Sequence, residues 1–169
     1  MSSFGNAKTR PNEPSMPDPL AYFLTCTTYG TWLPGDERGW VLKGKGFQLP
    51  NLETKQLAAD RMTEPPCTLD DLQREIVEET VRDHCTIRNW KLHAVNARTN
   101  HVHVVVTANS APKTVRDQLK AWCTKNPEED CRERGIPVLV KWWTRGGSRR
   151  FIGDKESLEA VIRYVLEGQ

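Results

Sequence analysis

The chain has 169 residues, of which 37% are hydrophobic and 27% are charged, and this composition fits one compact domain. No apolar stretch approaches the roughly 20 residues that cross a bilayer, and the first twenty residues lack the apolar core of a secretory signal. We therefore expect no membrane partner, a disordered tail at 1–19 and a single domain at 20–169. The formal net charge of +2 neither favours nor excludes nucleic acid as a ligand.

The five cysteines are scattered, odd in number and without a C-x-x-C pair. This pattern fits neither a disulfide framework nor a zinc ribbon. We therefore expect a reducing, cytoplasmic setting.

The first half of the chain predicts a strand, an insertion and a helix. Residues 22–32 are dense in aromatic and β-branched side chains, which favour a strand, and Pro34 ends it. Residues 35–67 are rich in Gly and Pro and predict an inserted loop, with a short helix at about 52–62. Asp70 is a possible N-cap for a helix at about 69–89.

The second half predicts a hairpin flanked by further elements. Residues 90–96 and 101–107 are expected to form its two strands. Pro112 suits the first turn of a helix that should end before Pro127. The remaining expected elements are a strand at 138–143, a return strand at 149–152 and a last helix that begins near Asp154 or Ser157 and runs through Leu166.

Strands and helices in this order predict an α+β fold. A central hairpin between two helices is typical of the split βαβ, ferredoxin/RRM-like antiparallel sheet with helices on one face. The C-terminal helix lies outside that pattern and is free to lie across the sheet. This helix carries a tyrosine, Tyr164.

Two of the four histidines, His101 and His103, lie two residues apart in the predicted strand. Strand side chains alternate between faces, so both imidazoles point to one side and Val102 points to the other. Two neutral imidazoles on one face provide two ligands of a divalent metal ion. The alternative is a polar sheet face whose histidines are hydrogen-bonded to neighbours.

Tyr164 stands in the last helix among apolar residues of the packing face. A tyrosine in such a place is more commonly a core or rim residue than a nucleophile. A phenol with an ordinary pKa near 10 attacks poorly unless its target is polarised. A metal ion held by His101 and His103 could polarise a phosphate in this way.

The chain resembles the single-tyrosine HUH transposases, a family that includes the REP-associated tyrosine transposases. The matching segments run in order along the chain: the aromatic strand and its Gly-Thr-Trp-Leu-Pro-Gly continuation, the histidine pair in 100–106, the Trp-Trp-Thr-Arg-Gly-Gly stretch at 142–147 and the helical tyrosine in 162–167. The resemblance covers about residue 20 to the C-terminus. A histidine pair followed about sixty residues later by a helical tyrosine is a fairly specific feature of this family.

The resemblance implies a role for each of these residues. His101 and His103 would bind Mg²⁺ or Mn²⁺ at the scissile phosphate of single-stranded DNA, beside a DNA hairpin. Tyr164 would attack that phosphate, giving a 5′-phosphotyrosine link and a free 3′-hydroxyl, and the reverse reaction would rejoin the strand. The domain would thus be an endonuclease-transesterase that acts as a monomer or a homodimer.

One position departs from the family pattern. The family places a third ligand, Gln or Asn, four residues after the tyrosine, where this chain has Gly168. Gln169 is the favoured substitute for the third metal ligand, and Glu167 or no third ligand remain open. If no third ligand serves, metal affinity would fall.

Two basic segments are candidate DNA-binding surfaces. Lys113, Arg116 and Lys120 recur at helical spacing, although a merely solvated face would show the same pattern. The second segment combines positive charge with a possible stacking surface, because at most one of two adjacent strand tryptophans faces a base. Its residues are Trp142, Trp143, Arg145, Arg149 and Arg150.

Two alternatives to a transposase-type enzyme remain. One is a non-catalytic hairpin-DNA-binding protein on the same scaffold, which Gly168 favours. The other is a small metal-binding protein unrelated to DNA, which rests on the histidine pair alone.

Overall fold

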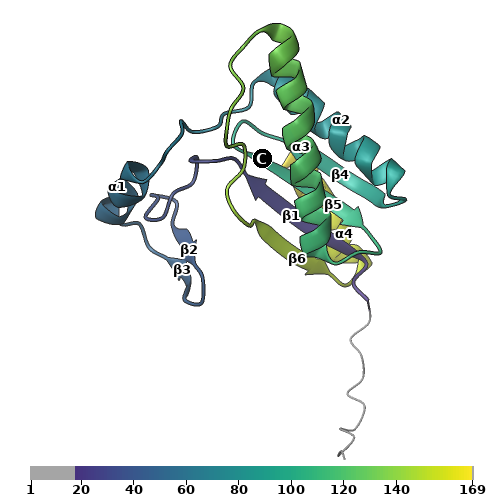
Figure 1. The fold of residues 1–169 in the computed structure, drawn as a ribbon. Helices are drawn as coiled ribbons and strands as arrows, with labels where there is room; N and C mark the ends of the chain where they lie inside the picture. Colours follow the sequence, from purple (N-terminus) through teal and green to yellow (C-terminus); the bar gives the residue numbers. More distant parts are fainter. Residues whose placement is uncertain (1–17, 169) are drawn as a thin grey trace, which may run out of the picture.

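The computed structural model describes residues 18–168, so most of the predicted tail, 1–17, lies outside the described residues. Its main sheet has four antiparallel strands in the order β4-β5-β1-β6. The strands are β1 (Ala21–Thr27), β4 (Lys91–Ala97), β5 (His101–Thr107) and β6 (Ser148–Ile152). Helices α2 (Asp71–Ile87) and α3 (Pro112–Arg134) cover one face, and α4 (Lys155–Glu167) lies on the other (Figure 1). The predicted α+β, split βαβ arrangement is confirmed.

The alternation of side chains along β5 divides the interior into two cores. Val102, Val104 and Val106 pack with apolar residues of α2 and α3. Val105 points to the opposite face, where it packs with Val161 and Val165 of α4. The histidines, at odd positions of the same strand, therefore share the face of α4.

Local sequence signals set the ends of the helices that flank β4 and β5. Asp70 accepts a hydrogen bond from the Gln73 amide, and the Gln73 side chain accepts one from the Asp70 amide, so α2 begins with a capping box. Helix α3 begins at Pro112 but continues through Pro127, so the prediction that it ends before Pro127 is wrong. Pro127 is fully buried in line with Cys123 and Cys131, and this packing outweighs the lost backbone hydrogen bond.

The strand expected at 138–143 is also absent. This segment runs along the backbone just beyond β1, where the Tyr29 amide donates to the Trp142 carbonyl and a single bridge joins Thr28 to Trp143. The edge of the sheet beside β1 is instead taken by β6, the expected return strand. The segment that follows β1 and the segment at 138–143 are thus joined by isolated backbone contacts rather than by a strand pairing.

The insertion folds into an arm that projects beyond the end of β1 (Figure 1). It contains the hairpin of β2 (Trp40–Leu42) and β3 (Gly46–Gln48), followed by α1 (Leu52–Asp60). The helix was expected and the hairpin was not. Gly39 has a φ of +79° and lies under the Phe47 ring, so a side chain at this position would collide with the ring. Within residues 18–168, no helix has the length and apolar character to span a membrane.

Candidate functional site

The two histidine rings lie side by side on the α4 face of the sheet. Their centroids are 4.6 Å apart, and His103 is buried whereas His101 is partly exposed. The side chain of Asn100 accepts a hydrogen bond from Nδ1 of His101 at 2.7 Å. Because an amide oxygen can only accept, Nδ1 carries the proton and the lone pair of the neutral ring lies on Nε2.

Tyr164 lies next to this pair on α4. Its ring centroid is 5.8 Å from that of His103 and 6.2 Å from that of Phe23, and the side chain is 48% exposed. Asp154 is the N-cap of α4, and its side chain accepts a hydrogen bond from the Ser157 amide. The apolar stripe of the helix packs onto the sheet. The helix therefore brings a phenol from the far end of the sequence beside the histidine pair.

A side chain on β4 fixes the end of this helix. Asn96 lies opposite His103 in the β4–β5 register and donates to the Val165 carbonyl at 2.9 Å. The carbonyls of the last helical turn have no partners within the helix, so this contact satisfies one of them. It also fixes the turn that carries Tyr164 to β4, the strand that pairs with the histidine-bearing β5.

The environment of His103 keeps its ring neutral. Nδ1 lies 2.9 Å from Oγ1 of Thr25, directly opposite on β1. Burial, reinforced by the neighbouring His101 and Arg98, lowers the pKa of His103 from 6.5 to about 4. A neutral imidazole oriented by a partner on one nitrogen can offer the other to a metal ion.

This pKa shift predicts acid sensitivity of the metal-free protein. Between pH 6.5 and about 4 the unfolded state binds a proton at His103 that the folded state does not, so stability falls as pH is lowered through this window. We expect a loss of up to about 3 kcal/mol in the free energy of unfolding. Urea denaturation with chelator present, compared between the native chain and His103→Gln, measures it. An equal pH dependence in both proteins would contradict the assignment.

The third ligand expected from the sequence is not established by the structure. Gln169 lies outside the described residues, and Glu167 is exposed at the end of α4. Gly168 caps the helix, its amide donating to the Tyr164 carbonyl at 3.0 Å. Over residues 18–168, no group of three His, Cys, Asp or Glu side chains is placed to share a metal ion. The two adjacent imidazoles fit a divalent cation as a pair of nitrogen ligands, and oxygen atoms of substrate or water would complete its shell.

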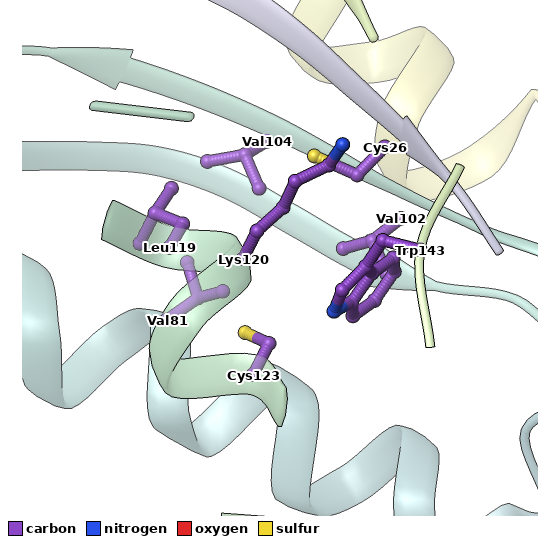
Figure 2. A pocket seen from close by; sticks show the side chains of 8 residues that line it. All are labelled: Cys26, Val81, Val102, Val104, Leu119, Lys120, Cys123 and Trp143. Atoms are coloured by element: carbon purple, nitrogen blue, oxygen red, sulfur yellow. The ribbon is translucent and has the colours of Figure 1, made fainter. Parts of the chain in front are cut away.

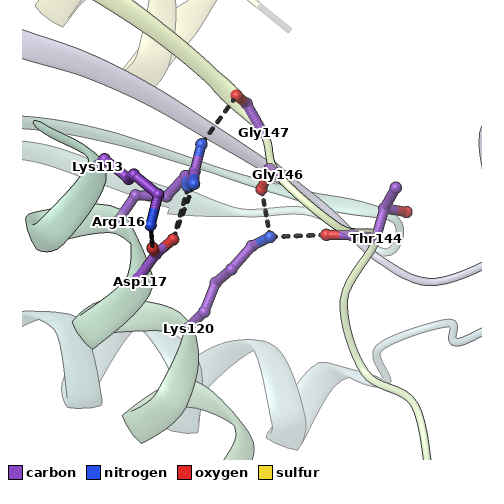
Figure 3. A network of polar contacts seen from close by, with 7 residues as sticks. All are labelled: Lys113, Arg116, Asp117, Lys120, Thr144, Gly146 and Gly147. Atoms are coloured by element: carbon purple, nitrogen blue, oxygen red, sulfur yellow. Dashed lines mark hydrogen bonds and ion pairs between the residues drawn. The ribbon is translucent and has the colours of Figure 1, made fainter.

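The predicted basic face of α3 points inward rather than to solvent. Arg116 is only 6% exposed, and its guanidinium pairs with Asp117 and donates to the Gly147 carbonyl. Lys120 donates to the carbonyls of Thr144 and Gly146 (Figure 3). The prediction that these two residues line a DNA-facing surface is therefore corrected. Only Lys113 is exposed, and it is paired with Asp117.

These contacts hold the loop between Trp143 and β6 against the sheet. The stem of Lys120 runs past Leu119 and Val104 towards Cys26, so that burial lowers the pKa of its amine (Figure 2). At Gly147 an added Cβ would lie 2.7 Å from the Thr25 carbonyl oxygen, so the loop passes too close to β1 for a side chain. Arg116 and Lys120 thus position the loop beside Thr25 and the histidines.

Removing this anchor is expected to destabilise the fold. Lys120→Met keeps the aliphatic stem but leaves two carbonyls without their charged donor, which costs about 1–3 kcal/mol in the free energy of unfolding. Lys113→Met removes an exposed ion pair of the same helix and should cost less than about 1 kcal/mol. Urea denaturation of both variants measures the difference. Equal, small effects would show that Lys120 does not hold the loop.

The second basic segment is divided between the two faces of the sheet. Trp142 is buried, so the prediction that it contributes to DNA binding is wrong. Trp143 donates its indole hydrogen to Thr124. Arg149 lies opposite Leu24 and shares the α2–α3 face, whereas Arg150 lines a hollow together with Tyr164. Arg145, Arg149 and Arg150 are exposed, and their DNA contacts remain predictions.

Comparison with known proteins gives two similar solved structures. No protein-family model and no curated protein matches the chain. A REP-associated tyrosine transposase bound to a REP hairpin has 10% identity and a TM-score of 0.47, covering 98% of this chain and 70% of the other. A protein from Deinococcus radiodurans R1 assigned as a transposase has 16% identity and a TM-score of 0.48, covering 94% and 96%. Both scores are below 0.5, so we derive function from this chain's own side chains.

Sequence reasoning missed the cleft in front of the histidines. It has a volume of about 580 Å³ and lies between the α4 face of the sheet and the arm. Phe23, Thr25, Thr27, His103, Thr144, Ser148 and Tyr164 line it on the sheet side, and Trp32, Leu33, Pro34, Trp40 and Val41 line it on the arm side. The run of apolar residues at 32–34 was visible in the sequence, but nothing indicated that it faces His103.

Proposed function

We propose that this protein cleaves and rejoins single-stranded DNA by transesterification, as a transposase-type enzyme. The observation that carries the proposal is the placement of Tyr164 beside His103, which in turn lies beside His101, at the wall of an open cleft. A candidate nucleophile and one of two adjacent imidazoles thus line one space that a strand can enter.

In the proposed reaction the Tyr164 oxygen bonds to phosphorus and loses its proton, while the bond to the 3′-oxygen breaks and that oxygen leaves as a hydroxyl. The products are a 5′-phosphotyrosine and a free 3′-hydroxyl. Attack by a 3′-hydroxyl on the phosphotyrosine reverses each change, so joining needs no further energy source. No water enters either step.

His101 and His103 would hold Mg²⁺ or Mn²⁺, which supplies Lewis-acid polarisation of the phosphate when bound. Thr25 and Asn100 orient the two rings, and burial keeps His103 uncharged. Asn96 holds the turn that presents the phenol. The half-exposed position of Tyr164 leaves its ring accessible to a strand in the cleft.

A labelled strand tests the proposal. A single strand carrying its label at the 3′ end should transfer the label to the protein in the presence of Mn²⁺, because the 3′ fragment retains the 5′-phosphate. A 5′ label should appear only on a released fragment. Transfer of the 5′ label, or cleavage without any labelled protein, would contradict the mechanism.

A non-catalytic hairpin-DNA-binding protein is the second candidate, favoured by Gly168, which offers no side chain four residues after Tyr164. It predicts salt-dependent binding of hairpin DNA with no labelled protein under any divalent metal. The same label-transfer experiment therefore separates the two.

A further inference from the structure

The proposed chemistry does not use the arm side of the cleft. Trp32, Pro34 and Val41 face the same space as His103 and Tyr164, although they lie outside the split βαβ core, in the segment that leads from β1 into the arm and in strand β2 of the arm. Trp32 is 45% exposed and Val41 is 74% exposed. Large apolar side chains left open to a cleft indicate a binding surface.

The arm holds this surface in a fixed position. The Trp32 indole donates to the Gly39 carbonyl at 2.8 Å, and the Arg38 guanidinium lies 4.7 Å from the centre of its ring. Arg38 and Lys55 both pair with the buried carboxylate of Asp36, and the Arg38 hydrogen bond holds the pKa of that carboxyl far below its usual range. The ring is therefore a pre-oriented platform rather than a free side chain.

Charge on the opposite rim identifies the kind of ligand. Arg150 lines a neighbouring hollow that shares Phe23 and Tyr164 with the cleft. The exposed Arg145 stands in the loop between Thr144 and Ser148, both of which line the cleft. A ligand that fits this cleft presents the flat face of a ring to the apolar arm side and negative charge to the cations on the opposite side. An unpaired nucleotide has this character, and a volume of about 580 Å³ lies within the range that holds a small ligand.

We propose that this cleft binds an unpaired nucleobase next to the scissile phosphate, with Trp32 as its stacking platform. The inference rests on the proposed DNA cleavage and assigns a ligand to the part of the cleft that the chemistry does not use. Trp32 is a binding residue and takes no part in bond formation. Stacking does not distinguish strongly among bases, so it holds the strand without fixing its sequence.

The test measures binding without cleavage, in full-length Tyr164→Phe protein. Fluorescence anisotropy compares a thymidine oligomer of about 20 nucleotides with an abasic oligomer of equal length, which has the same phosphates and no bases. We expect Trp32→Ala to weaken thymidine binding about tenfold or more and to leave abasic binding unchanged. Trp32→Phe, which keeps a ring, should stay within about threefold of the parent.

The chain offers a matched control in Trp122. This residue is 41% exposed and also carries a cation over its ring, at 4.9 Å from Lys125, but it lies on α3, across the sheet from the cleft. Trp122→Ala should keep the parent preference for thymidine. A thermal melt of each variant confirms folding. If the melting temperature of Trp32→Ala is lowered, Trp32→Phe and Trp32→Leu replace it, because they distinguish the loss of an aromatic ring from the loss of side-chain volume.

The outcomes separate this inference from the proposed function. Parent protein that binds neither oligomer at low salt overturns both. Binding of both oligomers that is unaffected by Trp32→Ala overturns the base site and leaves the cleavage proposal standing. If Trp32→Ala changes the oligomeric state in light scattering but not the preference for bases, the wall is a protein interface and the inference is wrong.

Discussion

Tyr164→Phe should abolish strand cleavage and covalent attachment while leaving DNA binding intact. The phenylalanine ring retains the contacts with Phe23 and His103, and only the nucleophilic oxygen is lost. We expect the cleavage rate to fall at least about a thousandfold, since removing a nucleophile eliminates the covalent route. Single-turnover cleavage of a labelled strand and anisotropy on the same strand measure the two properties.

Tyr22→Phe is the matched control for this variant. Tyr22 lies on β1 and contacts Phe151 edge to face, on the side of the sheet away from α4. Its cleavage rate should equal that of the native chain. If Tyr164→Phe cleaved at the native rate and Tyr22→Phe did not, the nucleophile would be misassigned.

His103→Ala is expected to have the second largest effect, a loss of at least about a hundredfold in cleavage with little change in hairpin binding. The variant removes the ring that lies between His101 and Tyr164. Cleavage rates of the variant and of the native chain, measured over a series of Mn²⁺ concentrations, show whether the substitution changes the metal requirement.

His93→Ala provides the comparison for the metal series. His93 lies on β4 and contacts the Thr107 hydroxyl of β5 at 2.8 Å, but it lines a separate hollow with Leu158 and Ile162 of α4. It should retain the native rate and the native Mn²⁺ dependence. Indistinguishable Mn²⁺ curves for His103→Ala and the native chain would remove the histidine pair from metal binding.

The strand that carries the histidines could be predicted because a single local sequence pattern determines it. The valines of 102–106 and the alternation of strand side chains determine both that the segment is extended and that His101 and His103 share a face. Helix α4 was predicted for a similar reason, since its apolar residues recur at helical spacing behind a capping Asp154. Both are local patterns that a sequence displays directly.

Features that depend on distant contacts were not predictable in this way. Pro127 continues α3 only because its neighbours bury the helix face, which no local rule for proline reveals. Arg116 and Lys120 have the spacing of a solvent-facing basic stripe, yet carbonyls of the loop that precedes β6 are their partners. The cleft needs the arm and the sheet at once, so Trp32 could not be placed opposite Tyr164.

Mass spectrometry of the protein after reaction with a single strand and Mn²⁺ tests the central claim most directly. The proposal predicts a peptide containing Tyr164 whose mass is increased by a 5′-phosphorylated DNA fragment, with nuclease digestion reducing the increment to one nucleotide. The same mass increment on a peptide without Tyr164, or cleaved DNA with every peptide unmodified, would contradict it.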